Sequence, residues 1–266
     1  MTQKQQPLFS VITITRNDLA GLRTTTDSVH RQSLQDFEHI VVDGASEDGT
    51  VEWLSQNLSL NPKVSWKSEH DTGIFNAMNK GAKLARGRLL VFMNSGDVFQ
   101  GDDDLAFVAS DWNRTAWTWA FGEMNYVDGA GRHQGATNQT ASSARHRALG
   151  LAFAPHQSTY MQTKFFRELG GFDEKFMFAC DQELAIRASQ VSLPVTWHRP
   201  LSRFLLGGAH SQTTMLDREM LYHAMREKNG ELLFGTKNLD KTFAAAMGAY
   251  RRLRIAGGAR VRRWRP

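Results

Sequence analysis

The chain has 266 residues, of which 41% are hydrophobic, 22% charged and 10% aromatic. Seven tryptophans and sixteen phenylalanines supply ample apolar surface for a core, which excludes a disordered chain, and no glycine period or repeated unit indicates a collagen-like or repeat protein. A single cysteine excludes an intramolecular disulfide framework and favours a reducing compartment. We expect one globular domain of generous size, or a domain with an appendage.

The formal net charge of +5 is concentrated at the C-terminus. Seven of the 32 basic residues are arginines within Arg251–Pro266, which holds no Asp or Glu, so residues 1–250 carry 25 basic against 27 acidic side chains. A polybasic segment interleaved with apolar residues is typical of contact with an anionic membrane surface. No nucleic-acid recognition module accompanies it, so we expect no nucleic-acid partner. A solvated terminus is the alternative.

The first hundred residues alternate between strand and helix patterns. The expected strands are 8–14, 39–42, 64–66 and 88–93, and the expected helices are 19–32, 51–58 and 74–85. We expect the last of these helices to be terminated by Gly87. This alternation predicts an α/β fold with a parallel sheet.

Polar loops follow three of these strands, at residues 15–18, 43–48 and 94–97. Ligands bind at the carboxyl edge of open α/β sheets, so we expect the loops to converge on one cleft. The absence of G-x-G-x-x-G and G-x-x-x-x-G-K-[ST] motifs disfavours dinucleotide oxidoreductases and P-loop NTPases. Acidic residues in the loops predict ribose contacts and Mg²⁺ or Mn²⁺ held by oxygen ligands, and hence a nucleoside-diphosphate substrate.

The second half is harder to interpret. Residues 120–129 are typical of a strand running into a turn, and the polar stretch 133–147 suggests a mobile loop. Trp112, Trp117 and Trp119 are expected in the core rather than in contact with a ligand. Two helices are expected near the C-terminus. Their apolar positions are Leu216, Met220, Leu221, Ala224 and Met225 for the first, and Phe243, Met247, Tyr250 and Leu253 for the second.

Several ordered motifs resemble family 2 glycosyltransferases of the GT-A fold. They lie at residues 10–17, 41–50, 71–81, 92–97 and 170–174, and the resemblance spans about residues 8–215. Within the family, the chain is most similar to bacterial enzymes of exopolysaccharide assembly, including colanic-acid-type enzymes. The resemblance implies an α/β, GT-A fold with a Rossmann-like, mostly parallel central sheet flanked by helices. It implies a catalytic domain at 1–215, with a nucleotide-binding half at 1–100 and an acceptor half at 101–215. C-terminal helices and a basic membrane-associating tail would then occupy 216–266.

The resemblance also implies a donor site. Thr15, Arg16 and Asn17 match the stretch along the nucleotide base, Asp43 matches the uracil- or ribose-binding aspartate, and Asp71 matches an acidic position lining the pocket. Asn94-Ser95-Gly96-Asp97 replaces the Asp-x-Asp-type motif that holds metal and diphosphate. At two positions where the family has acidic residues, this chain has Asn94 and Gly96. Ser95 is therefore assigned to the nucleotide and Asp97 to Mg²⁺ or Mn²⁺.

The acceptor side is implied by the second half of the resemblance. Asp181 matches the general base that opens a helix. Glu123, His156 and His210 match positions near the acceptor or sugar, and His210 could also complete the metal site. Among nearby residues, Glu183 is expected on a helix surface, Asp173 in a turn and Cys180 as a small buried neighbour of the base.

The implied function is an inverting transfer of a sugar from a nucleotide-diphosphate sugar, most simply a UDP-sugar, to a saccharide or lipid-linked saccharide of a bacterial surface polysaccharide. The alternative is a non-catalytic nucleotide- or glycan-binding scaffold, which the altered 94–97 motif favours and the joint presence of Asp43, Asp97 and Asp181 disfavours. The polar start of the chain and the lack of roughly 20 successive apolar residues predict a cytoplasmic protein, peripheral at the inner face of the cell membrane.

Overall fold

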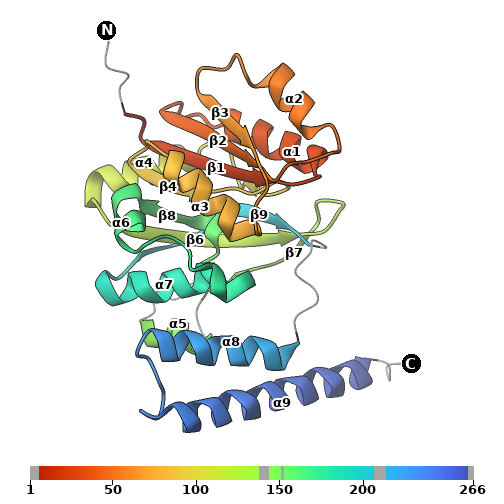
Figure 1. Ribbon diagram of the computed structural model, residues 1–266, viewed down its shortest axis with the longest axis vertical. Helices are drawn as coiled ribbons and strands as arrows, with labels where there is room; N and C mark the ends of the chain where they lie inside the picture. The colour runs from red at the N-terminus through yellow and green to blue at the C-terminus, as the bar shows by residue number, and fades with distance from the viewer. Residues whose placement is uncertain (1–5, 138–143, 151–152, 207–213, 263–266) are drawn as a thin grey trace.

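The computed structural model describes the chain except for residues 1–5, 138–143, 151–152, 207–213 and 263–266, and the side chains of residues 215 and 253–262. The described strands form one nine-stranded sheet in the order β3-β2-β1-β4-β8-β6-β9-β5, with β7 paired to β6 (Figure 1). The strands are β1 Phe9–Thr15, β2 Phe37–Asp43, β3 Val64–Ser68, β4 Leu89–Phe92, β5 Val98–Phe99, β6 Trp119–Val127, β7 His133–Ala136, β8 Thr159–Gln162 and β9 Val195–Leu205.

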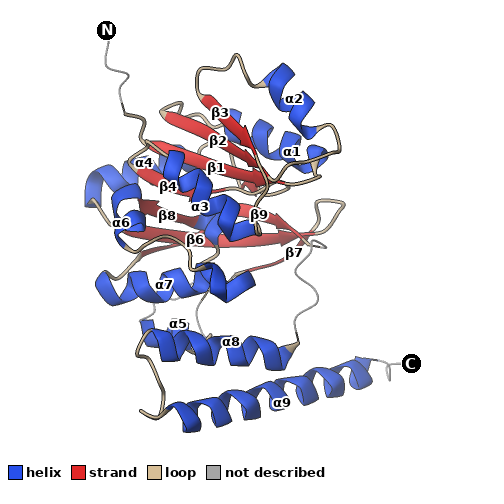
Figure 2. Ribbon diagram, viewed as in Figure 1, coloured by secondary structure: helices blue, strands red, loops and turns tan. Residues whose placement is uncertain are grey.

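Helices cover the sheet and continue below it as further layers (Figure 2). They are α1 Leu19–His30, α2 Thr50–Asn57, α3 Ile74–Leu84, α4 Asp104–Thr115, α5 Ala144–Ala148, α6 Thr163–Glu168, α7 Cys180–Val191, α8 Met215–Lys228 and α9 Lys237–Arg262, with short 3₁₀ segments η1 His156–Ser158 and η2 Glu174–Ala179. The α/β class and the alternating order of the first half are confirmed.

The N-terminal half of the sheet is parallel, as expected. β1 lies between β2 and β4, and β3 pairs with the outer side of β2. Every residue of β1 and β2 is buried, because helices cover both faces of these strands. The parallel register places Thr15 opposite Asp43 and Asp43 opposite Ser68, so three strands end in one row.

Gly87 has a different role from the expected helix terminator. α3 ends at Leu84, its C-cap Ala85 has an extended backbone, and Gly87 does not adopt a left-handed conformation. A Cβ atom on Gly87 would lie 2.4 Å from the backbone nitrogen of Ser10. Glycine is therefore required here because the chain passes directly against β1.

The second half of the sheet is mixed. β8 runs antiparallel to β4 and β6, whereas β6 and β9 are parallel. The expected mobile loop at 133–147 is partly regular structure: β7 pairs with β6, and α5 buries Arg147 completely. The polar composition did not indicate a strand, because β7 lies at the edge of the sheet and its residues are largely exposed.

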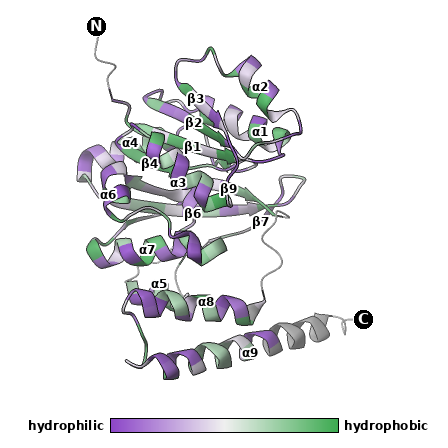
Figure 3. Ribbon diagram, viewed as in Figure 1, coloured by the Kyte–Doolittle hydropathy of each residue, from purple (hydrophilic) through white to green (hydrophobic). Residues whose placement is uncertain are grey.

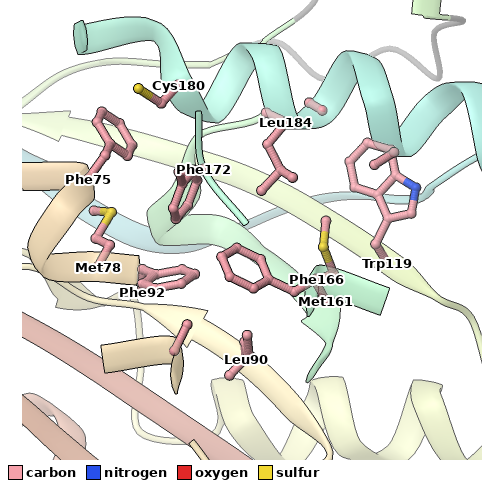
Figure 4. Close-up of a cluster of buried hydrophobic side chains, with 14 of the residues drawn as sticks. Phe75, Met78, Leu90, Phe92, Trp119, Met161, Phe166, Phe172, Cys180 and Leu184 are labelled. Atoms are coloured by element: carbon pink, nitrogen blue, oxygen red, sulfur yellow. The ribbon is translucent and has the colours of Figure 1, made fainter. Parts of the chain in front are cut away.

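An aromatic cluster joins the sheet to α7. The ring of Phe172 lies 4.9 Å from that of Phe75, 5.1 Å from Phe92 and 5.3 Å from Phe166, measured between centroids. Cys180 and Leu184 contribute to the same cluster from α7 (Figure 4). Trp112, Trp117 and Trp119 are buried, which confirms the core interpretation. The start of α7 is therefore fixed by apolar packing.

Helices α8 and α9 form the outermost layer. Asp240 of α9 is fully buried and bonds His223 and Arg226 of α8, while Arg226 also donates to the carbonyl of Ala148 in α5. On α9 the contact face differs in part from the expected one, since Ala244 is buried and Tyr250 is 56% exposed. The described part of α9 mixes hydrophilic and hydrophobic residues (Figure 3), and no helix within the described residues is long and apolar enough to cross a bilayer.

Candidate active site

The row of strand ends at β1, β2 and β3 forms the expected donor edge. The backbone continues this alignment beyond the strands: Gly44 N donates to Thr15 O, and Glu69 N donates to Asp43 O. Asn17 turns the chain with a positive φ of 51° and accepts a hydrogen bond from Glu47 N through its side chain. The loops after β1 and β2 are therefore tied together, as the sequence predicts.

Asp43 is fully buried, and its carboxylate shapes this edge. Oδ1 accepts from Ser46 Oγ, while Oδ2 accepts from Ser46 N at 3.0 Å and from Ser68 Oγ at 2.6 Å. Both oxygens are thus engaged within the protein. Any nucleotide contact by Asp43 has to share or replace these bonds, and its role in base or ribose binding stays a prediction.

The side chains of Arg16 and Asp71 both lie against Gly44. A Cβ atom on Gly44 would lie 2.6 Å from Asp71 Oδ2 and 3.2 Å from Arg16 Cβ. Asp71 Oδ1 also accepts from Gly73 N at 2.9 Å, which holds the carboxylate at the start of α3. The structure therefore brings together Thr15, Arg16, Asn17, Asp43 and Asp71, all five residues predicted from the first three strand ends.

The loop after β4 lies beside them, since Ser95 N donates to Ile14 O of β1. Ser95 Oγ donates to the carboxylate of Asp18, the N-cap residue of α1. Asp97 is buried and accepts from Gln157 Nε2 at 3.1 Å. Burial raises the pKa of Asp97 to about 7, although the charge of His156 and the bond from Gln157 oppose this shift.

The loop that carries Asp97 and the neighbouring end of β1 also hold oxygen donors of the kind that a cation accepts. Asn94 Oδ1 and Thr15 Oγ1 are buried without a hydrogen-bond partner, and both are oxygen donors of the kind that Mg²⁺ accepts. Within the described part of the chain, no cluster of three or more Asp, Glu, His or Cys residues could hold a metal alone. His210, the other predicted ligand, lies outside the described residues.

Asp181 opens α7, as predicted, and is linked to the β4 loop by His156. His156 Nδ1 lies 3.4 Å from Asp181 Oδ2, and His156 Nε2 lies 3.0 Å from Asn94 Nδ2. An amide nitrogen donates and an ionised carboxylate accepts, so the neutral tautomer that serves both contacts carries its proton on Nδ1. Asp181 Oδ1 accepts from Gln182 N at 2.8 Å, which leaves the carboxylate oriented from both sides.

A groove of about 550 Å³ opens in front of Asp181 and His156. Six aromatic side chains, each from a different part of the chain, line it: Phe75, Tyr126, Phe153, Phe178, Phe204 and Tyr222. Tyr222 and Arg218 come from α8 and were not identified from the sequence. In the sequence, these two residues are polar positions of an ordinary amphipathic helix pattern, and nothing else marked them as site residues.

Two acidic residues lie elsewhere than expected. Glu123 is absent from the lining of this groove, and its carboxylate faces His198 at 3.8 Å. Glu183 is fully buried instead of exposed, and it bonds Arg187 at 2.6 Å and Lys228 at 2.8 Å. The bond to Lys228 therefore holds α7 against α8. Asp173 is a turn residue, as predicted, and caps η2 through Lys175 N.

Comparison with known proteins decides the family. The model of glycosyl transferase family 2 matches residues 10–166. The chain belongs to this family. An uncharacterized glycosyltransferase of Mycobacterium tuberculosis is 38% identical to this family 2 glycosyltransferase over 210 residues, which cover 77% of this chain and 78% of the relative. A PGL/p-HBAD biosynthesis glycosyltransferase of Mycobacterium bovis is 37% identical over 105 residues. These residues cover 39% of this chain and 41% of the relative.

A solved structure supports the fold of this glycosyltransferase. Staphylococcus aureus TarS 1–349 in complex with UDP-GlcNAc superposes with a TM-score of 0.67 at 20% identity. The match covers 83% of this chain and 66% of the TarS chain, so about a third of the latter has no counterpart here. The GT-A fold and the transferase class predicted from the sequence are confirmed.

Proposed function

We propose that this family 2 glycosyltransferase is an inverting enzyme that moves a sugar from a UDP-sugar to a hydroxyl of a saccharide or lipid-linked saccharide. The observation that carries the proposal is the position of Asp181, buried at the start of α7 and held by His156 between the groove and the β4 loop. The residues of the donor edge lie on the other side of that loop. The UDP-GlcNAc complex of TarS supports a UDP-sugar as donor.

The reaction is a single in-line displacement. Asp181 accepts the proton of the acceptor hydroxyl while that oxygen attacks the anomeric carbon. The bond from this carbon to the diphosphate breaks, its electron pair leaves with the nucleoside diphosphate, and the configuration inverts. A general base contributes typically 10²–10⁴-fold to such a step. His156 orients the base by donating from Nδ1, and the aromatic walls of the groove exclude water.

We assign the cation site to Asp97, with Asn94 Oδ1 as a second oxygen donor and the diphosphate completing the ligand set. Bound there, Mg²⁺ or Mn²⁺ supplies positive charge that neutralises the departing diphosphate. Thr15, Arg16, Asn17, Asp43, Asp71 and Ser95 are assigned to the nucleotide. His156 is placed between donor and acceptor, whereas the location of Glu123 gives its acceptor role no support.

The acceptor belongs to a bacterial cell-surface glycan in this proposal. Its support is the Mycobacterium bovis relative, whose name places it in PGL/p-HBAD biosynthesis. The tail Arg251–Pro266 would hold the enzyme against the anionic inner face of the cell membrane, where lipid-linked acceptors can reach it. In this proposal the catalytic domain is 1–215, and the segment 216–266 adds two groove residues from α8, followed by α9 and this tail.

The direct test is a screen of UDP-, GDP- and dTDP-sugars with the purified full chain, scoring transfer and donor hydrolysis with Mn²⁺ and with EDTA. We expect turnover of a UDP-sugar, stimulated by Mn²⁺, and a product of inverted configuration by NMR. A product that retains the donor configuration contradicts the mechanism. Nucleotide binding without any turnover supports the non-catalytic scaffold instead.

A further inference from the structure

The groove in front of Asp181 contains one charge that the proposed reaction leaves unexplained. Among its described lining residues, Asp181 is acidic, the neutral His156 is hydrogen-bonded to it, and Arg218 is the one cation. The other lining side chains are neutral, and most are apolar or aromatic. Arg218 lies on α8, outside the segment 10–166 that the family model matches.

Within the part of the chain that the structure describes, no side chain pairs with the charge of Arg218. Its Nε is buried without a hydrogen-bond partner, and no carboxylate of the described residues forms an ion pair with it. The nearby Arg251 and Glu219 neutralise one another at 2.7 Å. Arg218 as a whole is half-buried, but burying its Nε without a partner costs free energy, because this N–H loses water without gaining an acceptor. An anionic group on a ligand in the groove would remove this cost.

The neighbouring Tyr222 links Arg218 to the reacting end of the groove. Burial raises the pKa of Tyr222, Arg218 lowers it and the charge of Asp181 raises it, so both charges act on the same hydroxyl. The Tyr222 ring lies directly against Gly150, where a Cβ atom would come within 2.9 Å of Tyr222 Cε2. Because Gly150 has a positive φ of 67° and lacks a side chain, the ring is seated at a fixed position in the groove wall.

The helix that carries Arg218 and Tyr222 is held firmly. Arg226 of α8 bonds Asp240 and the carbonyl of Ala148, and Lys228 bonds Glu183 of α7. Arg218 is thus carried by a helix that ion pairs hold against α7 and α9. A fixed guanidinium presents its Nε and one terminal nitrogen as a fork that matches the two oxygens of a carboxylate or phosphate.

We propose that Arg218 forms an acceptor subsite for an oxyanion, so that the acceptor is an anionic saccharide whose ring packs against Tyr222 while its hydroxyl reaches Asp181. This rests on the proposed glycosyltransferase function and specifies its acceptor class. The donor diphosphate is the rival ligand for Arg218. The predicted donor residues Thr15, Arg16, Asp43 and Asp71 are absent from the groove lining, which favours the acceptor.

The test measures binding, so it does not depend on turnover. Saturation-transfer NMR and calorimetry would compare methyl glucuronide, glucose 1-phosphate and neutral methyl glucoside on the UDP-saturated full chain. We expect one of the two anionic probes to bind at least about tenfold more tightly than methyl glucoside, and Arg218→Gln to remove this difference. The stronger anionic probe identifies the oxyanion as a carboxylate or a phosphate.

Controls separate this inference from the proposed function. Arg114→Gln removes an exposed arginine of α4, far from the groove, and should leave all three affinities within twofold. Equal binding of charged and neutral probes, no binding of any probe, or an unchanged preference in Arg218→Gln overturns the anionic subsite. A loss of UDP affinity in Arg218→Gln assigns the arginine to the donor diphosphate and also overturns it. Donor hydrolysis, measured separately, reports on the glycosyltransferase mechanism alone.

Discussion

At the residue scale, hydrogen bonds orient the carboxylate of Asp181, and apolar packing beside it fixes the start of α7. His156 and Gln182 N fix its carboxylate, while the adjacent Cys180 is buried in the aromatic cluster below α7. The thiol of Cys180 donates to the carbonyls of Asp173 and Met177, which ties the first turn of α7 to η2. A small buried residue beside the proposed base therefore helps to position it.

Cys180 should be chemically inert in the native protein. Burial raises the pKa of its thiol to about 12, and the charges of Asp181 and Glu183 add to this effect. The thiolate is the reactive form, so at pH 8 only about one molecule in 10⁴ carries it. We expect no modification by iodoacetamide at pH 8, measured by intact mass, and complete modification in denaturant. Rapid labelling of the native chain would contradict this prediction, because it would show that solvent reaches Cys180 at the start of α7.

At the scale of elements, the sequence predicts the first half of the fold and the donor edge well. Continuous β-branched runs and polar loops in α/β order specify β1, β2 and β4 and the row of strand ends. The mixed half is harder to predict because its paired strands are distant in sequence: Ala120 of β6 pairs with Val195 of β9. The groove was missed for the same reason, since Arg218 and Asp181 line one groove only because α8 packs on α5 and η2.

The attachment of α8 to α9 depends on Asp240. Asp240→Ala leaves the guanidinium of Arg226 and the ring of His223 buried without their acceptor. Breaking a buried pair in this way costs about 3–5 kcal/mol. We expect Tm, measured by scanning calorimetry, to fall by roughly 10 °C for a chain of this size.

Asp102→Ala is the matched control for this prediction, because Asp102 is 61% exposed and contacts Arg31 only at 3.6 Å. Its Tm should change by no more than about 2 °C. A similar Tm for both variants would mean that the buried network adds nothing to the C-terminal layer.

At the scale of the whole molecule, positive charge and catalysis occupy different parts of the chain. The body up to residue 250 is slightly acidic, while the arginines of the tail follow the outermost helix α9. Arg251 itself is bonded to Glu219, so it belongs to the packed part of α9. Membrane contact is therefore assigned to the residues that follow it.

Replacing three tail arginines, Arg254, Arg260 and Arg262, by Gln should weaken binding to vesicles that contain anionic lipid. Each arginine contributes about 1 kcal/mol at such a surface, so the partition coefficient should fall about 100-fold in a sedimentation assay. The control removes the same charge from the body through Arg31, Arg114 and Arg132, which are all exposed. Equal binding by both triple variants would show that net charge, not the tail, governs the interaction.

The most direct test of the account is Asp181→Asn, measured for sugar transfer and for UDP affinity in parallel. Asn preserves the shape of the side chain but cannot accept the acceptor proton, so we expect transfer to fall at least 100-fold while the Kd for UDP stays within twofold. Transfer at or near the wild-type rate with normal UDP binding would contradict Asp181 as the base and, with it, the proposed mechanism.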